Sequence, residues 1–433
     1  MRQLPKTLVS PVFVSTLLAL SLLCVLLTAC GDSDDRAPSA EQDTASSAPA
    51  ATPTASPAEA STPTQAATPV AAEENGAELE PAEQTPVATP TAEPATSTPE
   101  PTEQTPVATP TAEPATSTPE PTGAVLPPVP TPAASTVREL LALGRPLVIG
   151  HAGGDRSWPH STMYAFSQAA YAGVDVLEMD LQMTADRVLV VHHDDTVDRT
   201  TNATGRVRDM TYEELQALDN AYWWSEEWPS HDLAPDAYSY RGIRTGDVAP
   251  PEGYGPDDFR VETFRAVALA FPEHVLDVEI KTPAGDDGED DIDFILEMAA
   301  VLAAEIEELG RTDSVVVVSF RDEALVGFRE LAPEVVTSPG QDSLPAWAFA
   351  SVPLHPNDLI LQVPPTFSGL DVLTPDLLAK AADEGLAVWV WPNEDWQEHP
   401  DYYAELIDLP VDGVIAGRPA EAIERFRADG DIP

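Results

Sequence analysis

The stretch VIGHAGGD (residues 148–155) decides the fold together with VDVLEMDLQMTADRVLVVHHDDTVDRTT (residues 174–201). Two apolar runs, Val174 to Leu181 and Val188 to Val191, are bounded by turn residues and predict short strands. Four ionisable side chains lie at or just past the ends of the predicted strands: His151, Glu178, Asp180 and His193. Two imidazoles and two carboxylates on neighbouring strand ends are the parts of a metal-assisted acid–base site.

The globular part of the chain, residues 136–433, alternates apolar strand patterns with helical ones. The predicted strands are Leu147–Ile149, Asp175–Leu181, Val188–Val191, Val275–Ile280, Ser314–Val318, Leu359–Gln362, Ala387–Trp391 and Gly413–Ala416, with a weaker one at Glu334–Thr337. The predicted helices are Thr162–Ala172, Thr211–Leu218, Val261–Phe271, Ile292–Leu309, Glu323–Leu331, Pro375–Glu384 and Ala420–Ala428. This alternation favours an α/β fold, a (β/α)8 barrel, over a doubly wound sheet. Nine candidate strands compete for eight places, and residues 220–260 form an insertion near the mouth of the barrel.

The first 30 residues have the layout of an export signal. Arg2 and Lys6 precede a long apolar segment, which ends in Leu27-Thr28-Ala29-Cys30-Gly31. This ending resembles a bacterial lipobox, so we expect Cys30 to be lipidated and the protein to be anchored on the extracytoplasmic face of the cell membrane. The alternative is a plain transmembrane anchor, because the apolar run is nearly long enough to span a bilayer.

Residues 31–135 are predicted to be a disordered linker rich in Pro, Thr, Ala and Glu. The segment EQTPVATPTAEPATSTPEPT occurs twice, at residues 83–102 and 103–122, and most of the 45 prolines lie in this part of the chain. Such a composition favours extended polyproline conformation without a packed core. We therefore expect a spacer between the membrane and the barrel.

Charge and cysteine content exclude several kinds of site. The chain has 73 acidic and 22 basic residues and a formal net charge of -51, which repels nucleic acid and makes it an unexpected partner. Its two cysteines, Cys24 and Cys30, both lie in the export signal. The globular part therefore has no disulfide, no thiolate metal site and no cysteine nucleophile.

Three carboxylates are candidates for holding a cation. Glu178 and Asp180 are two apart on one predicted strand and so point to the same face, and Glu279 lies near the end of another strand. Without cysteine or a histidine-rich cluster, this set favours a hard ion, Ca²⁺ or Mg²⁺, over zinc. His151 and His193 could divide the acid and base roles, with Lys281 beside the developing phosphoryl charge.

These motifs resemble those of the glycerophosphodiester phosphodiesterases, a family of (β/α)8-barrel enzymes of the phospholipase C-like type. The family pattern is matched by His151-Ala152-Gly153, Pro159-His160-Ser161-Thr162, Glu178-Met179-Asp180, the run from His193 to Thr201, Glu279-Ile280-Lys281, Trp391 and Asp412-Gly413. The similarity covers about residues 146–420, with the order and approximate spacing of the motifs retained.

The resemblance implies a role for each matched residue. His151 and His193 would be the catalytic acid and base, and Glu178, Asp180 and Glu279 would hold a divalent cation, with Ca²⁺ favoured over Mg²⁺. Lys281 and Trp391 would contact a small glycerophosphodiester substrate. A glycerol hydroxyl would attack phosphorus to give a cyclic phosphate, which water opens to glycerol 3-phosphate, with release of an alcohol.

Two departures from the family pattern concern the substrate. Ala152 stands where the family has a phosphate-binding arginine, and His160-Ser161 replace Glu-Asn. Arg156 is close enough in sequence to take over the phosphate contact. Two other functions stay open: a phospholipase D-like phosphodiesterase or lyase that acts on lipids, and a surface protein that binds phosphodiesters without turnover.

Overall fold

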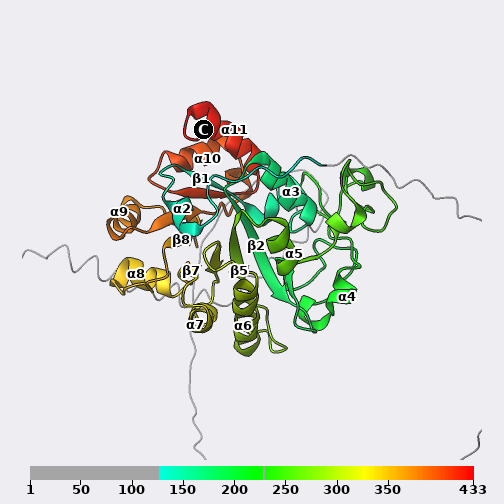
Figure 1. The fold of residues 1–433 in the computed structure, drawn as a ribbon, viewed down its shortest axis with the longest axis horizontal. Coiled ribbons are helices and arrows are strands. Elements are labelled where there is room, and N and C mark those ends of the chain that lie inside the picture. The colour runs from blue at the N-terminus through cyan, green and yellow to red at the C-terminus, as the bar shows by residue number, and fades with distance from the viewer. Residues whose placement is uncertain (1–125, 228–229) are drawn as a thin grey trace, which may run out of the picture. The chain divides into compact units, whose positions relative to one another are not determined.

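The computed structural model describes residues 126–227 and 230–433 (Figure 1). The predicted export signal, the lipidation site Cys30 and the linker up to residue 125 lie outside the described residues. Ala134 is already buried, and Thr136 caps the first described helix, α2 (Val137–Leu141), by accepting a hydrogen bond from the backbone N–H of Glu139. None of the helices in this part of the chain is long and apolar enough to cross a membrane.

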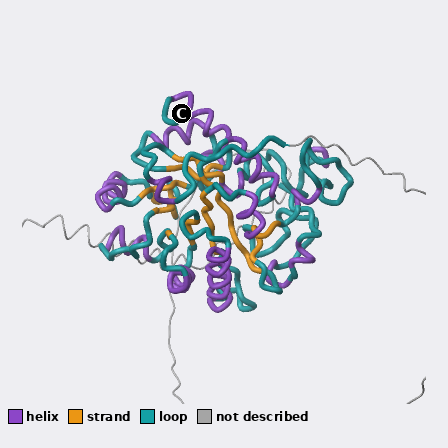
Figure 2. Tube along the Cα trace, viewed as in Figure 1, coloured by secondary structure: helices purple, strands orange, loops and turns teal. Residues whose placement is uncertain are grey.

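Eight parallel strands form the barrel, as the sequence predicted (Figure 2). In their spatial order they are β7 (Val336–Thr337), β6 (Val315–Val318), β5 (Val275–Ile280), β2 (Val176–Met183), β1 (Leu147–Gly150), β12 (Gly413–Ala416), β11 (Ala387–Val390) and β8 (Ile360–Val363). A parallel bridge between Thr337 and Asp358, just before β8, connects the two ends of this order. The strands therefore form a nearly closed ring.

Side chains hold the narrow join between β7 and β8, which we call the seam. The Thr337 hydroxyl donates to Asp358 Oδ1 at 2.6 Å, and Arg329 Nε donates to Thr337 Oγ1 at 3.0 Å. Arg329 also forms an ion pair with Asp358. Because β7 has only two residues, these bonds replace the backbone ladder that a longer strand would supply.

Helices cover the outside of the barrel (Figure 2). They are α3 (Met163–Ala172), α5 (Phe264–Ala270), α6 (Ile292–Glu308), α7 (Asp322–Leu331), α8 (Ser343–Ala350), α9 (Pro375–Glu384), α10 (Pro400–Ile407) and α11 (Pro419–Asp429). The short helix α4 (Tyr212–Leu215) packs instead in a separate apolar cluster. Local signals explain their ends: in α9, Thr374 accepts from the backbone N–H of Leu377, Pro375 takes the first position, and Gly385 ends the helix at φ 71°.

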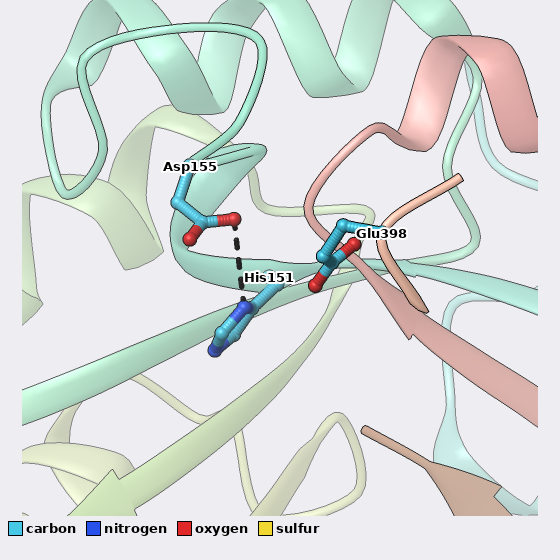
Figure 3. Close-up of side chains that lie close together, drawn as sticks. All are labelled: His151, Asp155 and Glu398. Atoms are coloured by element: carbon cyan, nitrogen blue, oxygen red, sulfur yellow. Dashed lines mark ion pairs between the residues drawn. The ribbon is translucent and has the colours of Figure 1, made fainter. Parts of the chain in front are cut away.

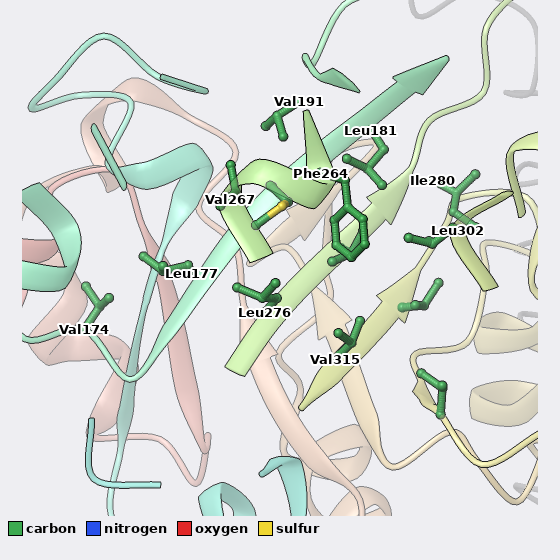
Figure 4. Packing of buried hydrophobic residues seen from close by; sticks show 14 of the residues in the cluster. Val174, Leu177, Leu181, Val191, Phe264, Val267, Leu276, Ile280, Leu302 and Val315 are labelled. Carbon is green, nitrogen blue, oxygen red and sulfur yellow. The ribbon is translucent and has the colours of Figure 1, made fainter. Parts of the chain in front are cut away.

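Strand alternation divides the apolar side chains into two cores. The outward side chains pack under the helices, for example Leu276 and Ile280 of β5 against Phe264 and Val267 of α5 (Figure 4). The inward side chains near the strand starts form a second cluster inside the barrel, which α2 covers through Val137 and Leu140. The strand members of this inner cluster are Leu147, Ile149, Val176, Val275, Val316, Val336, Ile360, Trp389 and Ile415.

One predicted barrel strand is not in the barrel. Val188–Val191 corresponds to β3 (Leu189–Val191), which pairs antiparallel with the far end of β2 and in turn with β4 (Glu262–Thr263). The physical reason is the short connection, since a parallel pairing needs a crossover of a dozen or more residues and residues 184–188 supply only a turn. The eighth place belongs to β7, within the weaker prediction at Glu334–Thr337.

The insertion predicted at residues 220–260 has mostly irregular structure with two short 3₁₀ turns, η3 (Pro235–Ala237) and η4 (Pro256–Phe259). Its aromatic residues pack on α3, where Phe259 stacks on Tyr164 with the ring centroids 4.9 Å apart. The indole N–H of Trp224 donates to the carbonyl of Asp155 at 3.0 Å. The insertion is therefore attached to the turn that follows β1.

Candidate active site

The inner face of the barrel changes from apolar to ionisable toward the carboxyl ends of the strands. On β2, Val176 is followed on the same face by Glu178 and Asp180, and on β5, Val275 is followed by Asp277 and Glu279. The register sets Glu178 beside Asp277 and Asp180 beside Glu279. The predicted carboxylates therefore lie together at the barrel end where active sites of this fold are found.

Lys281 joins two of the predicted cation ligands. Its Nζ lies 3.2 Å from Glu279 Oε1 and 3.4 Å from Asp180 Oδ1. Burial alone would raise the pKa of Asp180, but the Lys281 ammonium and then the nearby histidines hold it below its ordinary value. Burial, and then the charge of Asp180, raise the pKa of Glu178 well above its ordinary value. The site thus has more negative charge than one ammonium offsets.

The chemistry of these three carboxylates suits a divalent cation. Asp180 Oδ2 is buried and accepts no hydrogen bond from the described residues. Burial, with Asp180 as a neighbour, also raises the pKa of Glu279 despite its contact with Lys281. Carboxylate oxygens are the ligands of hard cations such as Ca²⁺ and Mg²⁺, and a cation would relieve the repulsion between these acids.

His151 begins the turn that leaves β1. Ala152 and Gly153 have positive φ angles of 46° and 81°, which turn the chain back and aim the Ala152 N–H at Glu178 Oε2, 2.5 Å away. A Cβ atom on Gly153 would lie 2.9 Å from the backbone N of Phe166, so glycine is needed where this turn meets α3. Because residue 152 is alanine, its backbone N–H lies beside Glu178, and the residue supplies no arginine guanidinium there.

Two acids that the sequence analysis did not assign surround His151 (Figure 3). Asp155 Oδ1 lies 3.5 Å from His151 Nδ1, and Glu398, after η5 (Asp395–Gln397), lies beside both. Burial would lower the pKa of His151, but Asp155, Glu178 and Glu398 together raise it well above its usual value. Asp155 lies in the stretch that decides the fold, whereas no motif marks Glu398.

His193 follows β3 and is oriented by its neighbour. Its Nδ1 lies 2.7 Å from Asp194 Oδ1, and Arg199 donates to both oxygens of Asp194, at 2.5 Å from Nε and 2.7 Å from Nη2. The His193 side chain is 42% exposed, whereas His192 is buried with its Nε2 3.0 Å from the carbonyl of Thr196. His193 is therefore the histidine of this pair that solvent and ligands can reach.

The remaining predicted site residues lie around the edge of this group. Arg156 pairs with Asp395 through Nη2 at 2.8 Å and approaches Asp155 through Nε at 3.6 Å. Trp391, just past β11, lies edge-on to Phe320 with the ring centroids 6.1 Å apart. Both side chains follow strands whose carboxyl ends open on the site.

His160 occupies the position where the family pattern has glutamate, and it is buried in the structure. Its Nδ1 lies 3.0 Å from Ser161 Oγ, and burial with the nearby Arg199 charge lowers its pKa to about 3. It is therefore neutral at physiological pH and supplies no charge to the site.

The family profile for the "Glycerophosphoryl diester phosphodiesterase family" matches residues 151–421. A glycerophosphodiester phosphodiesterase from Caldanaerobacter subterraneus subsp. tengcongensis is 26% identical over 295 residues, which are 66% of this chain and 99% of that protein. One from Bacillus subtilis is 30% identical over 207 residues, 47% of this chain and 62% of that protein. Other curated relatives are matched over about a third of their length or less.

Solved structures include proteins with a similar fold. A protein from Silicibacter pomeroyi DSS-3 that is assigned to the glycerophosphoryl diester phosphodiesterases superposes with a TM-score of 0.51 and 24% identity, covering 69% of this chain and 98% of that one. At this identity the likeness concerns the barrel itself.

Proposed function

The chain belongs to the glycerophosphoryl diester phosphodiesterase family, and from this premise we propose that it hydrolyses glycerophosphodiesters to glycerol 3-phosphate and an alcohol. One observation carries the proposal: the three predicted carboxylates, Lys281 and the turn that begins at His151 meet at one end of the barrel. Lys281 Nζ lies 3.4 Å from Asp180 Oδ1 and 3.2 Å from Glu279 Oε1, and the N–H that follows His151 donates to Glu178 at 2.5 Å.

The two histidines would divide the proton transfers. Each has its Nδ1 turned toward a carboxylate, Asp155 for His151 and Asp194 for His193, which leaves Nε2 for the substrate. One imidazole would take the proton of the attacking glycerol hydroxyl as its oxygen bonds to phosphorus. The other would give a proton to the alcohol oxygen as its bond to phosphorus breaks, and water would then open the cyclic phosphate.

Glu178, Asp180 and Glu279 would hold the divalent cation of this family. A bound cation would polarise the phosphoryl oxygens and offset their developing negative charge. We favour Ca²⁺ over Mg²⁺, because Ca²⁺ takes several protein oxygens in irregular geometry, whereas Mg²⁺ demands near-ideal octahedral coordination and keeps its waters. Lys281 would contact the phosphate from the same side, and Arg156 would replace the arginine absent at position 152.

We further propose that the enzyme works outside the cytoplasm, tethered by a lipid on Cys30. The lipobox-like ending of the export signal and the Pro/Thr-rich linker after it support this location. A Cys30→Ser variant expressed in a bacterial host should no longer be labelled by a fatty-acid analogue and should leave the membrane fraction. Unchanged membrane association and no labelling of the unaltered chain would contradict the lipid anchor.

The activity is tested with a panel of glycerophosphodiesters and ³¹P NMR of the products. We expect glycerol 3-phosphate to form from glycerophosphocholine with Ca²⁺ and not with EDTA. His151→Ala and His193→Ala should each lower the rate by roughly 10²–10⁴-fold, the usual contribution of a positioned acid or base. His355→Ala, at an exposed histidine outside the site, is the matched control and should keep the rate.

The panel also tests the two other functions. Phe320 and Trp396, on the segments after β6 and β11, are 42% and 65% exposed, so lysophosphatidylcholine belongs in the panel as a lipid substrate. Cleavage of that lipid alone would favour the lipid-directed enzyme. Binding of every diester without turnover, at any cation concentration, would favour the binding protein and sink the proposed hydrolysis.

A further inference from the structure

A second group of side chains that could bind a metal ion includes His151 itself. One ring nitrogen of His151 and one carboxylate oxygen each of Asp155 and Glu398 all lie within 4.8 Å of one another, and it is the Nδ1 atom that faces Asp155 (Figure 3). None of the three carboxylates proposed above for the divalent cation belongs to this group. The group therefore raises a separate question about what it binds.

Two of its three donor atoms are buried without a hydrogen bond. His151 Nδ1 and Asp155 Oδ1 have no hydrogen-bond partner among the described residues, and the 3.5 Å between them exceeds a normal hydrogen bond. Asp155 is only 9% exposed, so water does not easily satisfy it. The two atoms form a long ion pair rather than a hydrogen bond, so a cation between them would satisfy both.

The third donor, Glu398, is held in place by neighbours. The Tyr403 hydroxyl and the Gly417 N–H, the latter at 2.9 Å, both donate to Glu398 Oε2. These two bonds fix the plane of the carboxylate and so the direction of its other oxygen. The Glu398 carboxylate thus faces that of Asp155 beside His151, and a cation between the two acids would relieve their repulsion.

Gly417 keeps the space between the two acids open. A Cβ atom at this position would lie 2.4 Å from Asp155 Oδ1 and 3.0 Å from Glu398 Oε2. Glycine is thus the residue that lets both carboxylates approach His151. The resulting cage has one imidazole nitrogen and two carboxylates, which is a donor set of zinc rather than of the hard ions that oxygen-only sites select.

We propose that His151, Asp155 and Glu398 bind a divalent transition metal such as Zn²⁺, and that this binding inhibits the enzyme. The inhibition rests on the proposed function of His151. A metal on Nδ1 leaves the neutral ring with a proton on Nε2, so the ring can no longer accept a proton from the substrate. Ca²⁺ at the site of Glu178, Asp180 and Glu279 would then support the reaction, whereas Zn²⁺ at His151 would inhibit it.

Binding is measured on the full chain by titration calorimetry with Zn²⁺ in excess Ca²⁺. We expect a zinc site that weakens by roughly 10- to 100-fold in Asp155→Asn and in Glu398→Gln. It should be retained in Glu279→Gln, which alters the other cation site. Asp395→Asn is the matched control, because it removes a neighbouring carboxylate that is not in the cage, and it should bind zinc as the unaltered chain does.

Co²⁺ gives a second readout that does not depend on calorimetry. Bound through His151, it should show visible absorption of a nitrogen- and oxygen-ligated ion, which His151→Ala abolishes while circular dichroism confirms the fold. No zinc binding, or equal binding in Asp155→Asn and the unaltered chain, would overturn the proposal. Loss of zinc in Glu279→Gln but not in Asp155→Asn would place the ion at the oxygen-only site and overturn it as well.

Inhibition is measured with glycerophosphocholine at fixed Ca²⁺ and increasing Zn²⁺, each variant relative to its own zinc-free rate. We expect the rate of the unaltered chain to fall, a zinc chelator to restore it, and Asp155→Asn to need roughly 10- to 100-fold more zinc for the same effect. Zinc binding without loss of rate would refute the inhibitory part. If no diester is ever hydrolysed, the proposed function fails, while the calorimetry and Co²⁺ spectra still decide the metal site.

Discussion

Replacing Glu398 by glutamine should make the protein more stable above pH 7 and leave it unchanged in acid. Burial, and then the charge of Asp155, raise the pKa of Glu398 from 4.5 to about 7 in the folded protein. The folded state therefore binds this proton more tightly than the unfolded chain does. The protonated Glu398 carboxyl makes its full contribution to the free energy of unfolding below about pH 4.5. This contribution is lost as the pH rises through 7.

The size of the effect follows from the difference between the two pKa values. It corresponds to a loss on the order of 3 kcal/mol in the free energy of unfolding between acid and alkaline pH. Glutamine cannot ionise, yet its amide oxygen can still accept from Tyr403 and from the Gly417 N–H. The Glu398→Gln variant should therefore avoid most of this loss.

The assay is urea unfolding at pH 5 and pH 8.5 in EDTA, so that no cation compensates the carboxylate. We expect the two proteins to differ little at pH 5 and the variant to be more stable at pH 8.5. Glu330→Gln, at an exposed position of α7, removes the same charge from solvent and should show no such difference. A variant destabilised equally at both pH values would refute the argument, because Glu398 would then act as a hydrogen-bond acceptor only.

Three further substitutions test other parts of the structure. Lys281→Met should destabilise the protein in EDTA by about 3–5 kcal/mol, because it leaves the buried Asp180 and the half-buried Glu279 without their ammonium, and Ca²⁺ should stabilise this variant more than the unaltered chain in thermal unfolding. Arg311→Met should lower the free energy of urea unfolding by about 2–4 kcal/mol, since its buried guanidinium donates to carbonyls at the end of α5 and before β5, while kcat stays unchanged. Gly417→Ala, whose Cβ would clash with Asp155, should lower the free energy of unfolding by about 1–3 kcal/mol and reduce kcat/KM. Unchanged values in these assays would show that the contacts do not contribute as described.

The barrel could be predicted from the sequence because most of its strands are apolar runs bounded by turn residues. At two places the strength of the apolar pattern did not indicate which segment is a barrel strand. Leu189–Val191 is as apolar as any barrel strand but pairs antiparallel, and only the length of the preceding connection distinguishes it. Val336–Thr337 is so short that its place depends on neighbours far along the chain. Periodicity describes a segment by itself, whereas pairing depends on two segments.

Helices without a clear apolar stripe were missed for a related reason. α8, with the sequence SLPAWAFA, has a proline in its first turn and apolar residues on all sides, so no helical period stands out. α10 begins with Pro400 and buries Tyr403 and Leu406, but it directly follows an acidic, proline-containing segment that indicates a loop. Their helical state follows from packing on the barrel rather than from local pattern.

The predicted site residues gather at one end of the barrel, but Asp155 and Glu398 beside His151 were not among them. Glu178, Asp180, Glu279 and Lys281 were recognisable because each follows an apolar strand at a fixed parity. Glu398 gave no such signal, since it lies after a 3₁₀ turn and reaches His151 only because a single strand, β12, separates β11 from β1 in the barrel. A residue supplied by a distant loop can be found only once the ring of strands is known.

The sparse backbone pairing at the seam between β7 and β8 predicts where the barrel opens first. Among the described residues, the backbone pairing across it is limited to the bridge at Thr337, whose two hydrogen bonds go to residues 357 and 359, so the amides there should exchange with deuterium before those of longer strands. In the ring, β1, β2 and β5 lie away from the seam and pair with one another directly. A barrel that opens at the seam would thus become an open sheet in which the strands that carry the candidate site are still side by side. Local opening and loss of the site would be separate events.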